Sequence, residues 1–152
     1  MESKKQVGCI TINTDASYSH QKGVGGYAFY IVCDLFKIQK SGSFKHNPKS
    51  ALFAEMQCIA NALHTLLAQQ ELPKFNLLVI NCDCLPAFEH ISFNSKFEVG
   101  KMIFMQLKFL RCRYEFRHVK AHNGIPDSRS WVNDWCDKEA KKMMRKAYGK
   151  VK

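Results

Sequence analysis

The chain has 152 residues, of which 46% are hydrophobic and 24% are charged, as in an ordinary globular domain. We expect a single domain over 1–152 with its core at about 8–147, because this length buries a core without disulfides or a structural metal. No apolar stretch approaches the roughly 20 residues of a membrane span, and the polar start at Met1–Lys5 carries no apolar signal region. We therefore expect a cytoplasmic, monomeric protein without membrane contact.

The charge balance favours a polyanionic partner. Lys and Arg total 23 and Asp and Glu total 13, which gives a formal net charge of +10. Each phosphate that a protein neutralises releases condensed counterions, so a basic surface binds nucleic acid readily. A solvated basic surface without a partner explains the charge equally well.

The seven cysteines favour reduced thiols over a disulfide framework, because their number is odd and no two have CxxC spacing. Most of them lie inside apolar runs, namely Cys9, Cys33, Cys58 and Cys136. Zinc is an alternative that the ligand spacing disfavours. Its candidate ligands would be Cys82, Cys84, His118 and His122.

Hydrophobic periodicity and turn residues predict an alternation of strands and helices. The predicted elements are strands at 8–14, 27–33 and 35–44, a helix at 51–70, a strand at 77–80, helices at about 85–91 and 97–110, a strand at 113–119, a loop at about 121–130 and a helix at about 131–148. Gly23–Gly26 is predicted to form a turn, and Ser50 is placed to cap the first helix. This order indicates one α/β domain built on a sheet.

Four acidic residues interrupt the predicted core patterns. Asp15 ends the first predicted strand, and Asp83 follows the apolar run of the fourth. Glu55 and Asp137 lie on or beside the buried sides of their helices. Each acid taken alone can be a cap or a surface partner. Four acids from separate elements beside core positions indicate a functional site.

Such a cluster of acids requires compensation. Two like charges about 4 Å apart repel by roughly 4 kcal/mol at an effective dielectric constant of about 20. Oxygen ligands select hard divalent cations such as Mg²⁺ or Mn²⁺. Two such ions can promote phosphodiester cleavage. The acids therefore predict a metal site, and the positive charge of the chain suggests a nucleic-acid substrate.

Ordered local motifs resemble the type 1 ribonuclease H family. The motifs are Asn13-Thr14-Asp15-Ala16-Ser17 with Gly25-Gly26-Tyr27-Ala28, then Ser50-Ala51-Leu52-Phe53-Ala54-Glu55, Asn81-Cys82-Asp83-Cys84, Val119-Lys120-Ala121-His122-Asn123-Gly124 and Asn133-Asp134-Trp135-Cys136-Asp137-Lys138-Glu139-Ala140. They follow one another in the order that the family has. One such motif is weak, whereas the ordered series is specific.

The resemblance implies a ribonuclease H-like α/β fold, a five-stranded mixed sheet of three antiparallel and then parallel strands flanked by helices. It implies an endonuclease that hydrolyses the RNA strand of RNA–DNA hybrids and leaves 5′-phosphates. It also implies two Mg²⁺ ions, with Mn²⁺ as a substitute, on Asp15, Glu55, Asp83 and Asp137. His122, on a neighbouring loop, would assist proton movement or product departure.

Four further residues are candidates for holding the substrate. The backbone amides of Ala16 and Ser17 and the hydroxyl groups of Ser17 and Ser50 are suited to sugar or phosphate contacts. Asn133, four residues before Asp137, would orient that acid or the substrate. Ordinary turn and cap roles explain Ser17, Ser50 and Asn133 as well.

Some positions depart from the family pattern. Ala51, Leu52 and Phe53 replace the Asn pair or Gln that reads 2′-hydroxyl groups, and Leu85 stands where a Gln often follows the third acid. The 2′-hydroxyl distinguishes RNA from DNA, so a nuclease of the same fold acting on DNA or branched junctions stays open. So does a non-catalytic hybrid-binding module, although a binder of polyanions gains nothing from clustered acids.

Overall fold

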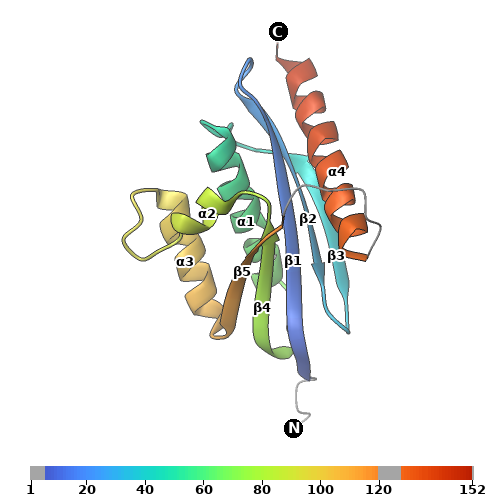
Figure 1. Cartoon of the computed structure of the whole chain (residues 1–152), viewed down its shortest axis with the longest axis vertical. Helices are drawn as coiled ribbons and strands as arrows, with labels where there is room; N and C mark the ends of the chain where they lie inside the picture. The colour runs from blue at the N-terminus through green and yellow to red at the C-terminus, as the bar shows by residue number, and fades with distance from the viewer. Residues whose placement is uncertain (1–5, 120–127, 152) are drawn as a thin grey trace.

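A computed structural model of the chain describes residues 6–119 and 128–151 (Figure 1). The elements are β1 (Gln6–Ser19), β2 (Val24–Val32), β3 (Lys37–Ser43), α1 (Ala51–Leu67), β4 (Lys74–Cys82), α2 (Leu85–Glu89), α3 (Glu98–Leu110), β5 (Arg113–His118) and α4 (Ser128–Lys150). Every strand and helix predicted from the sequence is confirmed in these ranges, with shifted ends. The loop predicted at about 121–130 lies mostly outside the described residues.

The strands form one five-stranded mixed sheet in the order β3-β2-β1-β4-β5. β1 pairs antiparallel with β2, and β2 pairs antiparallel with β3. β4 runs parallel to β1 and to β5. This is the mixed sheet that the resemblance implies, so the predicted fold is confirmed.

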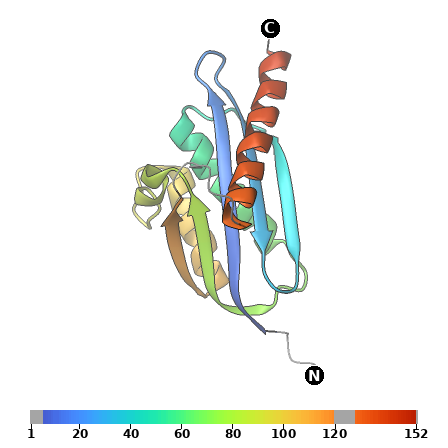
Figure 2. The ribbon, with the colours of Figure 1, turned by 45° about the vertical axis from the view of Figure 1, so that its right-hand side comes forward.

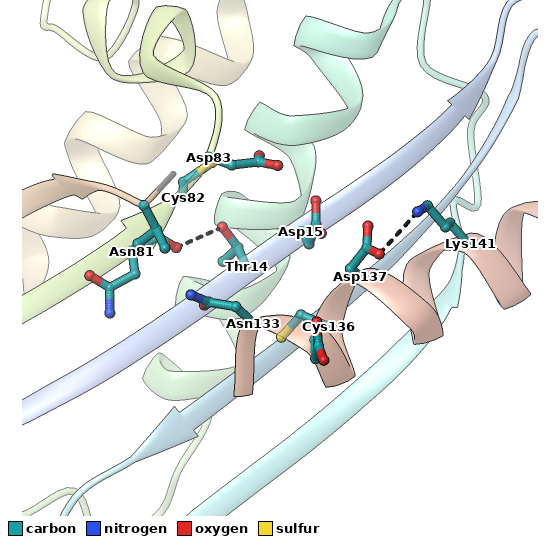
Figure 3. A pocket seen from close by; sticks show the side chains of 11 residues that line it. Thr14, Asp15, Asn81, Cys82, Asp83, Asn133, Cys136, Asp137 and Lys141 are labelled. Atoms are coloured by element: carbon teal, nitrogen blue, oxygen red, sulfur yellow. Dashed lines mark hydrogen bonds and ion pairs between the residues drawn. The ribbon is translucent and has the colours of Figure 1, made fainter. Parts of the chain in front are cut away.

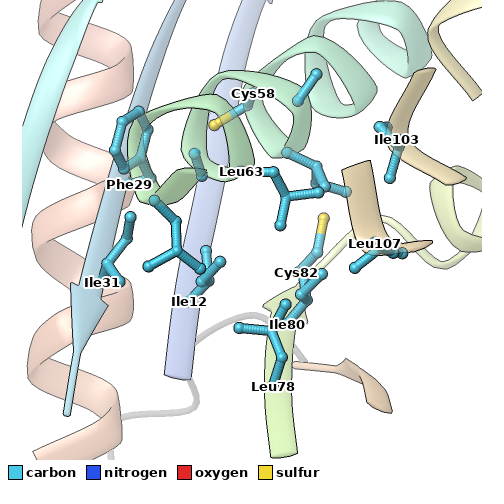
Figure 4. Packing of buried hydrophobic residues seen from close by; sticks show 14 of the residues in the cluster. Ile12, Phe29, Ile31, Cys58, Leu63, Leu78, Ile80, Cys82, Ile103 and Leu107 are labelled. Carbon is cyan, nitrogen blue, oxygen red and sulfur yellow. The ribbon is translucent and has the colours of Figure 1, made fainter. Parts of the chain in front are cut away.

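Helices cover both faces of the sheet. α4 lies in front of it in Figure 2, while α1 and α3 lie behind. Between α1 and the sheet lies the main core (Figure 4), which includes Ile12, Phe29, Leu63 and Ile80, each at most 1% exposed. None of the helices described here has both the length and the apolar character that crossing a bilayer requires.

A glycine allows α4 to pack closely on the sheet. A Cβ atom at Gly26 would overlap backbone atoms of Ala140 and Met144 in α4. Of the turn predicted over Gly23–Gly26, only the first residue lies in a turn. Gly23 has φ of 66° and closes the turn, whereas Gly25 and Gly26 belong to β2.

β1 is longer than predicted, and this changes the position of Asp15. The sequence placed Asp15 at the end of the strand, but β1 continues to Ser19. Pairing with β4 stops at Asn13, while pairing with β2 continues to Ser19. Asp15 thus lies just beyond the point where β1 and β4 separate.

All seven cysteines are free thiols, as expected. Cys58 and Cys136 are buried, in agreement with their apolar surroundings, whereas Cys9 and Cys33 are only half-buried. Cys82, at the end of β4, is the third buried cysteine.

Candidate active site

A crevice opens where β1 and β4 part. Its volume is about 300 Å³, and its walls come from β1, the end of β4 and the part of α4 between Asn133 and Lys141. Ligand sites of α/β sheets form in this way, beyond the carboxyl ends of neighbouring parallel strands. The lining residues that carry acidic groups are Asp15, Asp83, Asp134 and Asp137.

Three of the four predicted acids line this crevice: Asp15 on β1, Asp83 directly after β4 and Asp137 on α4. Asp83, Asp15 and Asp137 follow one another across it in Figure 3. Glu55, from α1 on the other face of the sheet, is only 8% exposed. The amide nitrogen of Ala16 lies 2.9 Å from Asp15 Oδ1 and 3.3 Å from Glu55 Oε1, so one backbone donor serves both carboxylates.

Glu55 also lies close to the end of β4. Its carboxylate accepts a hydrogen bond from Cys82 Sγ at 3.6 Å. One ligand atom each from Glu55, Cys82 and Asp83 lies within 4.8 Å of the others, a spacing that could hold a metal ion. Because carboxylates complete the group around Cys82, its chemistry is mainly that of oxygen ligands, and the zinc alternative gains no support.

Burial and mutual repulsion raise the pKa values of three of the acids, Asp15, Glu55 and Asp83. Burial, followed by the charges of Asp83 and Asp137, raises the pKa of Asp15 to about 8. Burial, followed by the charges of Asp15 and Asp83, raises the pKa of Glu55 well above its usual value. The pKa of Asp83 is also raised, chiefly by burial. Full ionisation of the cluster therefore requires added positive charge.

Among the residues that the structure describes, Lys141 is the cation on the crevice wall. Lys141 Nζ lies 3.0 Å from Asp137 Oδ2, one helical turn further along α4, and both side chains are about half exposed. Lys141 also lowers the pKa of Asp15, although this effect is smaller than those of burial and the acids. A single exposed lysine leaves most of the acidic charge uncompensated.

Polar contacts fix the strands that carry the acids. Asn81 Nδ2 donates to Asn13 Oδ1 at 3.0 Å across β4 and β1, and Thr14 Oγ1 donates to the carbonyl oxygen of Asn81 at 3.4 Å. Cys58 Sγ, from α1, donates to the carbonyl oxygen of Asp15 at 3.3 Å. The backbone on either side of the crevice is thereby held in place.

The structure gives local roles to the predicted substrate residues. Asn133 lines the crevice beside Asp137. Ser50 caps α1, because its side chain accepts a hydrogen bond from the amide of Phe53 at 3.2 Å. Ser17 is half-buried on β1. Contact of any of them with substrate stays a prediction.

Two further predicted residues need comment. The amide of Ala16 already donates to Asp15 and Glu55, which gives Ala16 a role in positioning the acids. Its contact with substrate also stays a prediction. His122 lies outside the described residues.

Three further residues lie near the acids, of which sequence reasoning singled out only His118, as a ligand of the disfavoured zinc site. Asp134 and Lys141 line the crevice, and His118 Nε2 lies 2.8 Å from the carbonyl oxygen of Asp83. For Lys141 a signal existed, since a lysine four residues after an aspartate on a helix usually pairs with it. For Asp134 the sequence offered none, and for His118 it indicated only the zinc alternative.

A comparison with known families agrees with this geometry. The family model for RNase H matches residues 8–145, which include the four acids. Among curated proteins, no match to the chain was found. Membership supports a nuclease of the hydrolase class that binds nucleic acid. Since the match covers most of its length, the chain belongs to the RNase H family.

Proposed function

We propose that this protein is a divalent-metal-dependent endonuclease that hydrolyses the RNA strand of RNA–DNA hybrids and leaves 5′-phosphates. The observation that carries the proposal is that Asp15, Asp83 and Asp137 line one crevice while Glu55 lies beside it, sharing the Ala16 amide with Asp15 and grouping with Cys82 and Asp83. The four acids are remote in sequence and belong to an RNase H family domain.

The donor set fits hard divalent cations. The acids are carboxylates, and burial, followed by the charges of neighbouring acids, raises the pKa values of Asp15 and Glu55, so a bound cation would favour their ionised forms. Mg²⁺ is the ion such oxygen ligands favour, with Mn²⁺ as a substitute. Asp15, Glu55, Asp83 and Asp137 would hold two ions. Once bound, these would supply the positive charge that activates an attacking water and stabilises the leaving oxygen.

Residues of the chain would orient these acids and the substrate. The Ala16 amide fixes one oxygen each of Asp15 and Glu55, so their remaining lone pairs are available to cations. Lys141 and Asn133 stand on the α4 wall, where an ammonium and an amide group suit phosphate oxygens. His122 would assist proton movement or product departure, as the family resemblance implies.

A cleavage assay tests the proposal. Labelled RNA–DNA hybrid, double-stranded RNA and duplex DNA are incubated with Mg²⁺, Mn²⁺ or EDTA, and the product ends are identified. We expect cutting of the RNA strand of the hybrid, with a metal requirement and 5′-phosphate ends. Asp83→Asn should abolish it without loss of hybrid binding. Asp34→Asn, at an exposed position after β2, is the matched control and should cut normally.

The same assay distinguishes a second candidate function. Ala51 and Leu52 stand where family members carry groups that read 2′-hydroxyls, and Ala51 is exposed. This observation favours a less strict choice between RNA and DNA. Equal cutting of duplex DNA would establish that second function. Tight, salt-sensitive binding without cutting would contradict both and favour a binding module.

A further inference from the structure

A second cavity lies between α1 and β3, on the side of the sheet opposite α4. Its volume is about 360 Å³. The cationic and titratable residues that line it are Lys40, Lys45, His46 and His64, and we call it the basic groove. The proposed function uses none of these residues.

The groove exists because α1 packs on β1 and β2 and leaves the neighbouring face of β3 open. Lys40 pairs with Phe29 across β3 and β2, so both side chains lie on the α1 face of the sheet. Phe29 is buried under α1, whereas Lys40, one strand further out, is exposed. The open face of β3 therefore becomes one wall of a groove, and the outer side of α1 becomes the other.

The lining has the chemistry of an anion site. Within residues 6–119 and 128–151, no aspartate or glutamate lines the groove. The ion pairs among the described residues involve none of its lysines or histidines. On the α1 wall, Gln57 Nε2 donates to Asn61 Oδ1 at 3.1 Å, which leaves the amide nitrogen of Asn61 as a further donor. Unpaired cations and donors without acids are complementary to phosphate groups.

The floor of the groove is aromatic but mostly covered. The ring centroid of Tyr27 lies 6.0 Å from that of Phe29 and 5.1 Å from that of Phe44. Phe29 and Phe44 are buried and only Tyr27 is half-exposed, so successive bases have no platform on which to stack. The groove is thus suited to the sugar-phosphate backbone rather than to particular bases.

The groove lies beside the crevice. Tyr27 in its floor pairs directly with Ala16, whose amide holds Asp15 and Glu55. Gln57 in its wall is two residues after Glu55 on α1. A helix is about 10 Å across and a nucleic-acid strand rises about 3.4 Å per nucleotide. A strand leaving the crevice over the start of α1 would reach the groove within about three nucleotides.

We propose that the basic groove binds the phosphates of a nucleic-acid strand that continues beyond the cleavage crevice. This contact deepens the proposed function and rests on it. It would strengthen binding of long substrates without reading their sequence, because it engages only the backbone.

Binding and cutting are measured separately to test the groove. One probe is a short RNA–DNA hybrid that covers the crevice alone. Two others carry a single-stranded RNA tail on its 5′ or its 3′ side. Fluorescence anisotropy in EDTA reports binding over a range of salt concentrations, and cleavage in Mg²⁺ gives kcat and KM. The variant Lys40→Gln/Lys45→Gln removes two cations from the groove.

The control removes equal charge elsewhere. Lys37 and Lys74 are exposed at the starts of β3 and β4, at the end of the sheet remote from the crevice. Lys37 also lies on the opposite face from Lys40, because side chains alternate along a strand. Lys37→Gln/Lys74→Gln therefore matches the net charge of the groove variant.

We expect one tail to strengthen binding by the wild-type chain about tenfold and the groove variant to lose this gain. The slope of log K against log salt should decrease by about 1.4, since each phosphate contact with a single strand contributes about 0.7. In the groove variant, affinity for the short hybrid and kcat should equal those of the wild-type chain. The control variant should keep the full gain in affinity that the tail gives. His64→Gln, on the other wall, should give a smaller loss in the same direction.

Two outcomes would contradict the proposal that the basic groove binds a nucleic-acid strand. Either neither tail helps the wild-type chain, or the control loses as much affinity as the groove variant. Tail-dependent binding without cutting in Mg²⁺ would refute the proposed endonuclease and leave the groove as a nucleic-acid site.

Discussion

The crevice and the basic groove are cavities of similar size and opposite charge. The crevice, of about 300 Å³, brings four aspartates to one place with Lys141 as their cation. The groove, of about 360 Å³, brings together two lysines and two histidines, and no acid of the described part of the chain lines it. The two cavities would meet two different requirements of a nuclease. Binding of catalytic metal ions requires concentrated negative charge, whereas binding of the nucleic-acid substrate requires positive charge.

The two cavities also differ in how they affect stability. Glu55 and Asp15 are held in surroundings that raise the pKa of each, so ionising them strains the folded state. Lys40 and Lys45 are exposed and remain solvated. Substitutions in the crevice should therefore change stability as well as activity, whereas substitutions in the groove should change binding alone.

Asp15→Asn should give the largest effect. Activity should fall at least 10²- to 10³-fold, roughly the effect of removing one electrostatic catalytic group. The asparagine can still accept the hydrogen bond from the Ala16 amide, so the fold is retained. Without metal the variant should be more stable at neutral pH by about 1 kcal/mol, because asparagine is neutral without taking up the proton that Asp15 must bind on folding. A rise in Tm of about 2–4 °C is then expected.

Cleavage rates and calorimetric melting in EDTA measure these two effects. Lys40→Gln is the contrasting variant and should leave Tm unchanged. A lower Tm for Asp15→Asn would mean that the acidic cluster does not strain the folded protein.

Gly26→Ala should have the second-largest effect, and it should disturb the crevice more than the groove. The added methyl group meets the backbone of α4, which forms one wall of the crevice and no part of the groove. We expect a loss of about 1–3 kcal/mol in the free energy of unfolding, as for other overpacked sites. Reduced cleavage should accompany it, because Asp137 moves with α4.

Chemical denaturation and tail-dependent binding would be compared for this variant. Gly8→Ala is the control, since a Cβ atom there meets nothing within 4 Å, and its stability should not fall. A Gly26→Ala protein of normal stability would show that α4 does not depend on this close approach.

Mg²⁺ affinity should depend on pH in the crevice. The folded-state pKa of Asp15, about 8, is above the ordinary value of 3.8, so below pH 8 the folded chain holds an extra proton. Metal binding must release it, and affinity should rise up to about tenfold per pH unit before levelling above about pH 8. The metal-free protein should lose stability as pH rises between these values, because the folded state binds more protons than the unfolded state.

Titration calorimetry in buffers of different ionisation enthalpy measures both the affinity and the released proton. Asp15→Asn should flatten the pH dependence. If the wild-type chain released no proton on binding Mg²⁺ at pH 6, the raised pKa of Asp15 would be contradicted.

The sequence predicted the elements and the four acids because local patterns encode them. Alternation identified the strands, helical spacing identified α1 and α4, and the ordered motifs identified the acids. The predicted end of β1 was wrong, because the end depends on which neighbouring strand continues to pair with β1, and pairing is a tertiary property. Asp15 consequently lies within the strand rather than at its end.

The basic groove could not be predicted from local patterns. Asn61 and His64 lie on the outer side of α1, where polar residues usually face solvent. Lys40 comes from a distant strand and meets them only because α1 does not cover β3. Lys141 was closer to prediction, because its spacing from Asp137 is visible in the sequence.

Lys141→Met should give the smallest effect and sharpen the contrast between the cavities. In the crevice, Lys141 is a cation in an acidic surrounding that pairs with Asp137, and it would compete with a bound metal ion for that carboxylate. Because the pair is about half exposed, its contribution is below about 1 kcal/mol, so Mg²⁺ affinity should increase only about two- to fivefold. The gain should shrink at high salt, which screens exposed charges. Lys142→Met, whose Nζ lies 4.0 Å from Glu139 Oε1, removes the same charge one residue further on. An equal gain in both variants would indicate that net charge, rather than competition at Asp137, sets metal affinity.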